Sequence, residues 1–152
     1  MRRACEIRTA GSWNAATAID RVVLDANERH RRRIALTGER GTAFLLDLPQ
    51  TTALKDGDGL VLEDGAIVRV AGKAEPLLEI AAASPHELAR LAWHIGNRHT
   101  EVQVMGDRLR IRRDRVLEEM LRGLGARLTA IEAPFDPEHG AYGDANNHDH
   151  DH

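Results

Sequence analysis

The chain has 152 residues, of which 42% are hydrophobic and 30% charged, as in a globular protein with one ordinary domain or two small ones. Its net charge of -3 and aromatic content of 3% argue against nucleic acid or an anionic membrane as the main partner. Cys5 is the single cysteine, which excludes an intramolecular disulfide and a cysteine-rich zinc site. No secretory signal and no apolar run of about 18 residues is present, so we expect a cytoplasmic protein.

Residues 1–72 are expected to form an N-terminal β domain. Short segments rich in leucine and β-branched residues alternate with turn formers, at 19–25, 33–37, 42–48, 59–64 and 66–70. The last two are the clearest pair, because Asp64-Gly65 between them suits a two-residue hairpin turn. The basic run 27–33 (NERHRRR) is interpreted as a solvated edge or loop, with an anion- or partner-docking patch as the alternative.

The pattern changes after residue 73. It predicts a domain over 76–135, with strands and helices in the order β-α-β-β-α-β at 76–83, 84–96, 100–113 (two strands), 114–125 and 126–135. This order is that of a ferredoxin-like domain, an antiparallel sheet with two helices on one face. Ser84 and Glu87 are expected to form a capping box at the start of the first helix, and Gly96 to end it.

Residues 136–152 show no periodicity and are rich in Gly, Pro, Asp and Asn, so we expect a flexible tail. The tail ends in NNHDHDH, which carries His148, His150 and His152. Short histidine-rich tracts are typical of metal binding, because neutral imidazole suits Ni, Cu, Zn and Co. A tag remnant and an inert charged end are the alternatives. Because a flexible tail must be ordered on binding, it needs a partner ligand on the folded domain.

The candidate for that partner lies in WHIGNRH, residues 93–99. Gly96 and Asn97 tolerate left-handed conformations, so the chain is expected to leave the helix there and present His99 beyond its end. By its pattern alone, His99 is either a surface residue or a ligand. His94 lies beside the apolar stripe and is expected to pack against it or to lie at its rim, and His86 is assigned no role.

Four segments carry a resemblance to a known family: GNRH (96–99), TEVQV (100–104), DRVLEEMLRGLGA (114–126) and PFDPEHGAYG (134–143) with histidines after it. Together they resemble the UreE urease accessory proteins, a family of nickel metallochaperones, over essentially the whole chain. The resemblance implies an α+β protein of two domains. The N-terminal all-β domain is related to an Hsp40 peptide-binding domain, and the C-terminal ferredoxin-like βαββαβ domain binds metal and carries a disordered histidine-containing tail.

The resemblance also implies a homodimer, in which His99 of both copies binds one Ni2+ at the interface and His148, His150 and His152 complete the coordination. The cargo is delivered to the apo-urease activation complex with the urease accessory GTPase. Nickel is taken from the family, since the general order of divalent affinities does not select it, and Zn2+, Cu2+ or Co2+ are expected to substitute in vitro. Arg112, Arg113 and Arg115 stand where some relatives carry histidines, and guanidinium offers no lone pair, so a second site there is not expected.

The sequence bears on three other functions. A metallohydrolase would need a fixed ligand cluster such as HExxH, which the sequence lacks, so we expect no enzyme activity. An RNA-recognition module shares the β-α-β-β-α-β order, but VQVMG and LRIR lack the stacking aromatics. A general divalent-metal buffer or storage protein without a client is the alternative that the sequence leaves open.

Overall fold

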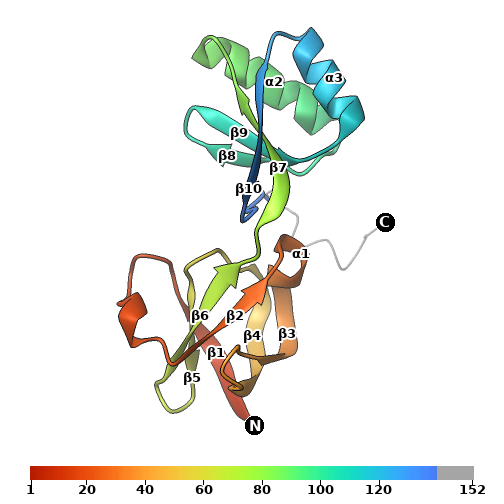
Figure 1. The fold of residues 1–152 in the computed structure, drawn as a ribbon. Coiled ribbons are helices and arrows are strands. Elements are labelled where there is room, and N and C mark those ends of the chain that lie inside the picture. Colours follow the sequence, from red (N-terminus) through yellow and green to blue (C-terminus); the bar gives the residue numbers. More distant parts are fainter. Residues whose placement is uncertain (140–152) are drawn as a thin grey trace. The chain divides into compact units, whose positions relative to one another are not determined.

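The computed structural model describes residues 1–139. The chain forms two compact units, one from Met1 to Lys73 and one that begins at Ala74 (Figure 1). Among the described residues, no helix has both the length and the apolar character that crossing a membrane requires.

The first unit is a six-stranded mixed sheet with the strand order β2-β6-β5-β1-β4-β3. β1 pairs in parallel with β4 and antiparallel with β5, and β2 pairs in parallel with β6. This unit confirms the expected all-β domain; besides its strands it contains one turn of 3-10 helix and one of α-helix. The bounds are β1 Arg2–Arg8, η1 Ala15–Thr17, β2 Asp20–Leu24, α1 Ala26–Arg29, β3 His30–Thr37, β4 Ala43–Ala53, β5 Gly59–Leu62 and β6 Ile67–Gly72.

Buried and exposed residues alternate along the strands, and the buried ones form the core of this unit. In β2 the buried positions are Asp20, Val22 and Leu24, with exposed residues between them. β5 and β6 form the predicted antiparallel hairpin, and Gly65 in its turn has φ 89°. Positive φ is unfavourable for residues with a Cβ, so glycine suits this turn.

Two elements of this unit escaped the sequence analysis. β1 is central in the sheet, yet its one fully buried side chain is Ala4, and a register shift follows at Glu6. The basic run 27–33 divides between α1 and β3; residues 31–33 are exposed on this edge strand, as the solvated-edge interpretation predicts. Within it Arg29 is 2% exposed, and its guanidinium donates to the carbonyl oxygens of Leu24 and Leu54 at 3.1 and 3.0 Å.

The second unit has the predicted order β-α-β-β-α-β, with a four-stranded sheet ordered β10-β7-β9-β8. The ferredoxin-like arrangement is therefore confirmed. Leu91 and Ile95 of α2 and Leu117 and Leu121 of α3 share one core with the sheet, so both helices cover the same face. The bounds are β7 Glu75–Ala81, α2 Pro85–Asn97, β8 Gln103–Met105, β9 Arg108–Arg112, α3 Arg115–Gly123 and β10 Arg127–Ala133.

The helices begin at the predicted caps. The side chains of Ser84 and Asp114 accept hydrogen bonds from the third helical N–H of α2 and α3, at 3.1 and 3.0 Å. The predicted capping box at α2 is only half formed, because the Glu87 carboxylate binds Arg90 at 2.9 Å. α3 ends in a Schellman motif, in which Gly125 has φ 90° and its N–H donates to the carbonyl of Arg122.

Candidate metal-binding site

His99 occupies the position just after the C-terminal end of α2. The helix continues through Asn97, Arg98 caps it, and the His99 N–H donates to the carbonyl oxygen of Gly96 at 3.0 Å. Its φ is 55°, the one left-handed non-glycine conformation among residues 1–139. The expectation that Gly96 ends the helix is therefore wrong, because Gly96 is helical and the reversal occurs at His99. Histidine is among the side chains enriched at positive φ, so this position is accessible to it.

The end of α2 is held firmly against the sheet. Leu91 and Ile95 are 1% and 0% exposed, so the last turns of the helix are fixed by packing. His99, in contrast, is exposed. Its imidazole is thus presented to solvent from a rigid framework, which lowers the entropy lost when a ligand binds.

The neighbouring ring residues of α2 differ in their surroundings. His94 is half-buried, and its ring meets Trp93 edge-on, with centroids 5.0 Å apart and an interplanar angle of 82°. This contact agrees with the packing role expected for His94. Trp93 is 63% exposed, which is unusual for so large an apolar side chain.

Metal-ligand side chains do not cluster within residues 1–139. No three His, Cys, Asp or Glu side chains in this range converge on a point that could hold a metal ion. Of the four predicted ligands, the structure describes His99, which belongs to no such group of three among residues 1–139. The other three, His148, His150 and His152, lie outside the described residues.

Arg112 and Arg113, where no second metal site is expected, act as ion-pair partners. Arg112 binds Glu75 at 3.0 Å and Glu101 at 2.5 Å, and its guanidinium lies 4.8 Å from the centre of the Phe135 ring. Arg113 binds Glu118 at 3.0 Å. This hydrogen bond from Arg113, opposed by partial burial, lowers the pKa of the Glu118 carboxyl group. These pairs connect β9 to β7, to the loop before β8 and to α3.

The chain after β10 crosses the sheet towards β8. Phe135 is fully buried beneath the Arg112 guanidinium of β9. The Asp136 N–H then donates to Oε1 of Gln103 at 3.0 Å, and the Glu138 N–H donates to the carbonyl oxygen of Val102 at 2.8 Å. We call residues 134–138 the crossing segment. It connects one edge strand of the sheet to the other, and it includes the first residues of the predicted tail.

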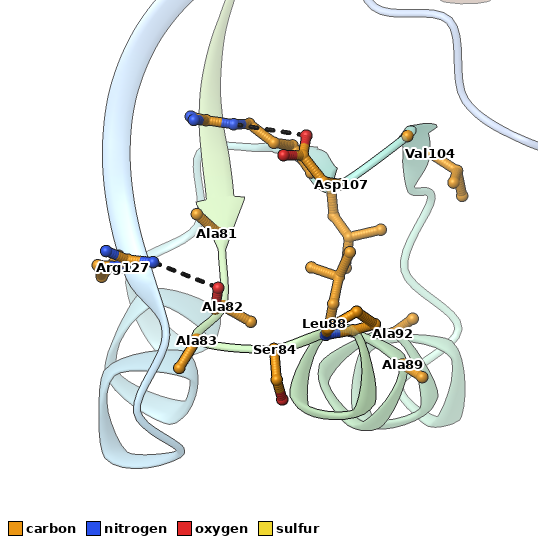
Figure 2. Close-up of a pocket in the computed structure, with 14 residues that line it drawn as sticks. Ala81, Ala82, Ala83, Ser84, Leu88, Ala89, Ala92, Val104, Asp107 and Arg127 are labelled. Carbon is orange, nitrogen blue, oxygen red and sulfur yellow. Dashed lines mark hydrogen bonds and ion pairs between the residues drawn. The ribbon is translucent and has the colours of Figure 1, made fainter.

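A cavity of about 650 Å³ lies at the opposite end of α2 (Figure 2). Leu88 and Ala92 of α2 line it together with Val104, and the Arg127 guanidinium donates to the Ala82 carbonyl oxygen at 3.3 Å on its rim. No histidine or cysteine lines it, and its one carboxylate, Asp107, is highly exposed. The cavity therefore offers no metal site and is separate from His99.

Comparison with known proteins agrees with this architecture. The family models for the N-terminal and C-terminal domains of the UreE urease accessory protein match residues 3–72 and 75–152. The chain belongs to the UreE family. The two matches meet where the structure divides into two units, and together they cover nearly the whole chain.

Individual UreE relatives are also similar to this chain over most of their length. The chain is 58% identical to a urease accessory protein UreE of Bradyrhizobium sp. strain BTAi1, over 98% of this chain and 73% of the relative. It is 55% identical to that of Rhodopseudomonas palustris strain BisB18, over 100% and 72% of the two chains. For the Rhodobacter capsulatus protein the identity is 47%, over 100% and 94%. Each of these three relatives is named a urease accessory protein.

Proposed function

We propose that this chain is a nickel metallochaperone of urease maturation. It binds Ni2+ through His99 in a symmetric homodimer and delivers the ion for assembly of the urease active site. The observation that carries the proposal is the presentation of His99: in a UreE family member, an exposed imidazole stands at a rigid helix end. Neutral imidazole nitrogen is a ligand that suits Ni2+.

A dimer supplies a second His99 imidazole, which one chain lacks. In a two-fold symmetric interface each residue near the axis meets its own copy, so one His99 per chain provides two nitrogens. Trp93, 63% exposed six residues before His99, supports an interface at this end of α2, since large exposed apolar side chains mark sites of association. Burial of both indoles would hold the two His99 rings close to the axis.

The tail histidines complete the coordination in this proposal. His148, His150 and His152 are tethered to the same domain, and a flexible tether gives an effective concentration on the order of millimolar. They release the ion one imidazole at a time, which suits a carrier that passes its cargo on. Zn2+, Cu2+ and Co2+ bind the same nitrogens, so nickel specificity in the cell depends on supply and on partners.

The partners follow from the proposed cargo. The dimer hands Ni2+ to the urease accessory GTPase and the apo-urease activation complex in the cytoplasm. A general metal buffer without a client would bind the same ion but have no effect on urease. Deletion of the gene separates the two: a carrier's loss abolishes urease activation at low nickel and is rescued by excess nickel, whereas a buffer's loss leaves activation intact.

The metal site is tested by calorimetric titration of Ni2+ into the full-length protein and its His99→Asn variant. Asparagine tolerates positive φ, so the helix end is preserved while the imidazole is lost. We expect the parent to show a tight site of one Ni2+ per two chains, and the variant to lose it. His86→Asn, an exposed histidine in the first turn of α2, is the matched control and should titrate like the parent. A His99→Asn protein that retains the tight site would overturn the proposal.

A further inference from the structure

We infer that the cavity at the start of α2 binds an organic anion that has an apolar body and a single carboxylate, such as an aliphatic acid. This site is separate from the proposed metal site, so it adds a second binding function to the proposed one. Three features of the cavity carry the inference: its small apolar walls, the open face of Val104 and the charge of Arg127.

The cavity exists because small residues stand where larger ones would close the domain. In α2, Pro85, Ala89 and Ala92 lie on one side of the helix by their spacing, and all three line the cavity. The strand side of the wall is formed by residues 81–83, all alanine, at the end of β7 (Figure 2). The volume of about 650 Å³ lies within the range of about 300–1,000 Å³ that is typical of sites for small organic ligands.

Val104 shows that apolar surface of this domain is left open at the cavity. It lies opposite Leu109 in the antiparallel pair of β8 and β9, and directly opposed residues face the same side of a sheet. Leu109 is 2% exposed and belongs to the core beneath the helices, whereas Val104 is 52% exposed. The alanines of α2 are too short to cover Val104. Part of the helix-covered face therefore stays accessible to an apolar ligand.

The charges at the rim favour an anion at one point. Arg108 is paired twice, with Glu79 at 2.9 Å and with Asp107 at 3.9 Å. Arg127, on the other side of the cavity from Asp107, donates to the carbonyl oxygen of Ala82 at 3.3 Å, and no carboxylate of residues 1–139 pairs with it (Figure 2). One cation thus lacks a counter-charge beside an apolar cavity. Arginine has five N–H donors in one plane, so it can bind a carboxylate and keep its bond to the carbonyl.

Together these features define the class of ligand. The apolar walls disfavour a sugar or a polyphosphate, whose polar groups would lose water without gaining hydrogen-bond partners. Arg127 accommodates one negative charge, and the N-terminal end of α2, a helix of 13 residues, adds partial positive charge nearby. An apolar body with one terminal carboxylate meets these conditions. Its source is either a free carboxylic acid or an apolar residue at the carboxyl end of a polypeptide.

The test titrates the metal-free full-length protein with two fluorescent probes, anilinonaphthalene sulfonate and the uncharged phenylnaphthylamine, which has the same rings without the sulfonate. Ala89→Leu fills the cavity from an exposed helical position, so it should weaken binding of both probes by about tenfold. Arg127→Gln should weaken binding of the anionic probe by about tenfold and leave that of the uncharged probe unchanged. The matched controls, His86→Leu in α2 and Arg122→Gln in α3, are exposed outside the cavity and should bind both probes like the parent.

Competition against the anionic probe distinguishes the two sources of the ligand. Displacement by octanoate supports a free acid, and displacement by a short peptide ending in leucine, but not by its amide, supports a polypeptide end. NMR amide signals of residues 81–83 and Ala89 should shift in the parent, which locates the site without a substitution. Unchanged affinity of Ala89→Leu for both probes, or displacement by neither competitor, would overturn the inference. His99→Asn should bind both probes like the parent, so this failure is distinct from that of the proposed function.

Discussion

Asp20 is a buried carboxylate whose ionisation should control the acid stability of the first unit. It is 5% exposed at the start of β2, and its Oδ1 atom accepts hydrogen bonds from the N–H groups of Arg21 at 2.7 Å and Arg40 at 2.9 Å. Oδ2 accepts from the N–H of Thr42 at 3.1 Å. These bonds attach the turn between β3 and β4 to β2.

The pKa of Asp20 gives the size of this effect. Burial alone raises the pKa, but hydrogen bonds from Arg40, Thr42 and Arg21 to the charged form outweigh burial and lower it from 3.8 to about 2. A fall of nearly two pKa units, at about 1.4 kcal/mol per unit, corresponds to roughly 2 kcal/mol of stability. Because the pKa is lower in the folded state, this stability is fully present above pH 3.8 and is lost as the pH falls through 2.

Asp20→Asn removes the charge and one acceptor oxygen while keeping the size of the side chain. We expect it to lower the free energy of unfolding of this unit by about 2–3 kcal/mol at pH 7. The difference from the parent should shrink towards zero between pH 4 and pH 2, since protonation removes the same charge from the parent. Urea unfolding followed by Trp13 fluorescence, in a Trp93→Phe background, reports this unit specifically.

The matched control for this experiment is Glu6→Gln, an exposed carboxylate of β1 in the same unit. Its surface pair with Arg8 contributes little, so its unfolding curve should follow that of the parent at each pH. A gap between Asp20→Asn and the parent that stays constant down to pH 2 would refute the assignment of the effect to ionisation. A gap below 0.5 kcal/mol at pH 7 would refute the structural role of the three hydrogen bonds.

Three further substitutions test packing. Gly38→Ala should destabilise the first unit by about 1–3 kcal/mol in the same urea assay, because its methyl group would overlap the Asp20 carboxylate. In α3, Gly123→Ala should raise the melting temperature by circular dichroism, since no atom lies within 4 Å of the added methyl and alanine favours helix by about 1 kcal/mol. Leu121 is 0% exposed, so Leu121→Ala should lower the free energy of unfolding by about 2–5 kcal/mol. Val116 is 63% exposed, so Val116→Ala should lower it by less than about 0.5 kcal/mol. Equal losses for the two variants would contradict the assigned core.

The elements predicted best are those whose signals are local. The β5–β6 hairpin follows from Asp64-Gly65 between two apolar runs, and α2 and α3 follow from a capping side chain and an apolar stripe at helical spacing. β1 was missed because its pairing is not local. It joins β4 and β5, which are some 40–60 residues away, and it buries only Ala4 completely.

The candidate site was predicted only in part, because some of its contacts also join residues far apart in the sequence. The exposure of His99 after a helix follows from the helix pattern, but the residue that reverses the chain does not, because Gly96 looked like the natural stop. The structure assigns the reversal to His99 itself. The crossing segment was also missed: Phe135 and Glu138 find their partners more than 20 residues earlier, and a composition rich in Pro and Asp gave no signal of this. The metal-binding role of His99 and the terminal histidines stays a prediction.

The left-handed conformation of His99 has a consequence for how metal loading can be observed. One residue both closes the last turn of α2 and offers the proposed ligand, so an ion that immobilises its ring also restrains its amide. Deuterium uptake at this amide, whose hydrogen bond to Gly96 is the outermost of the turn, should therefore slow when the site fills. The helix end would then report occupancy without a spectroscopically active metal.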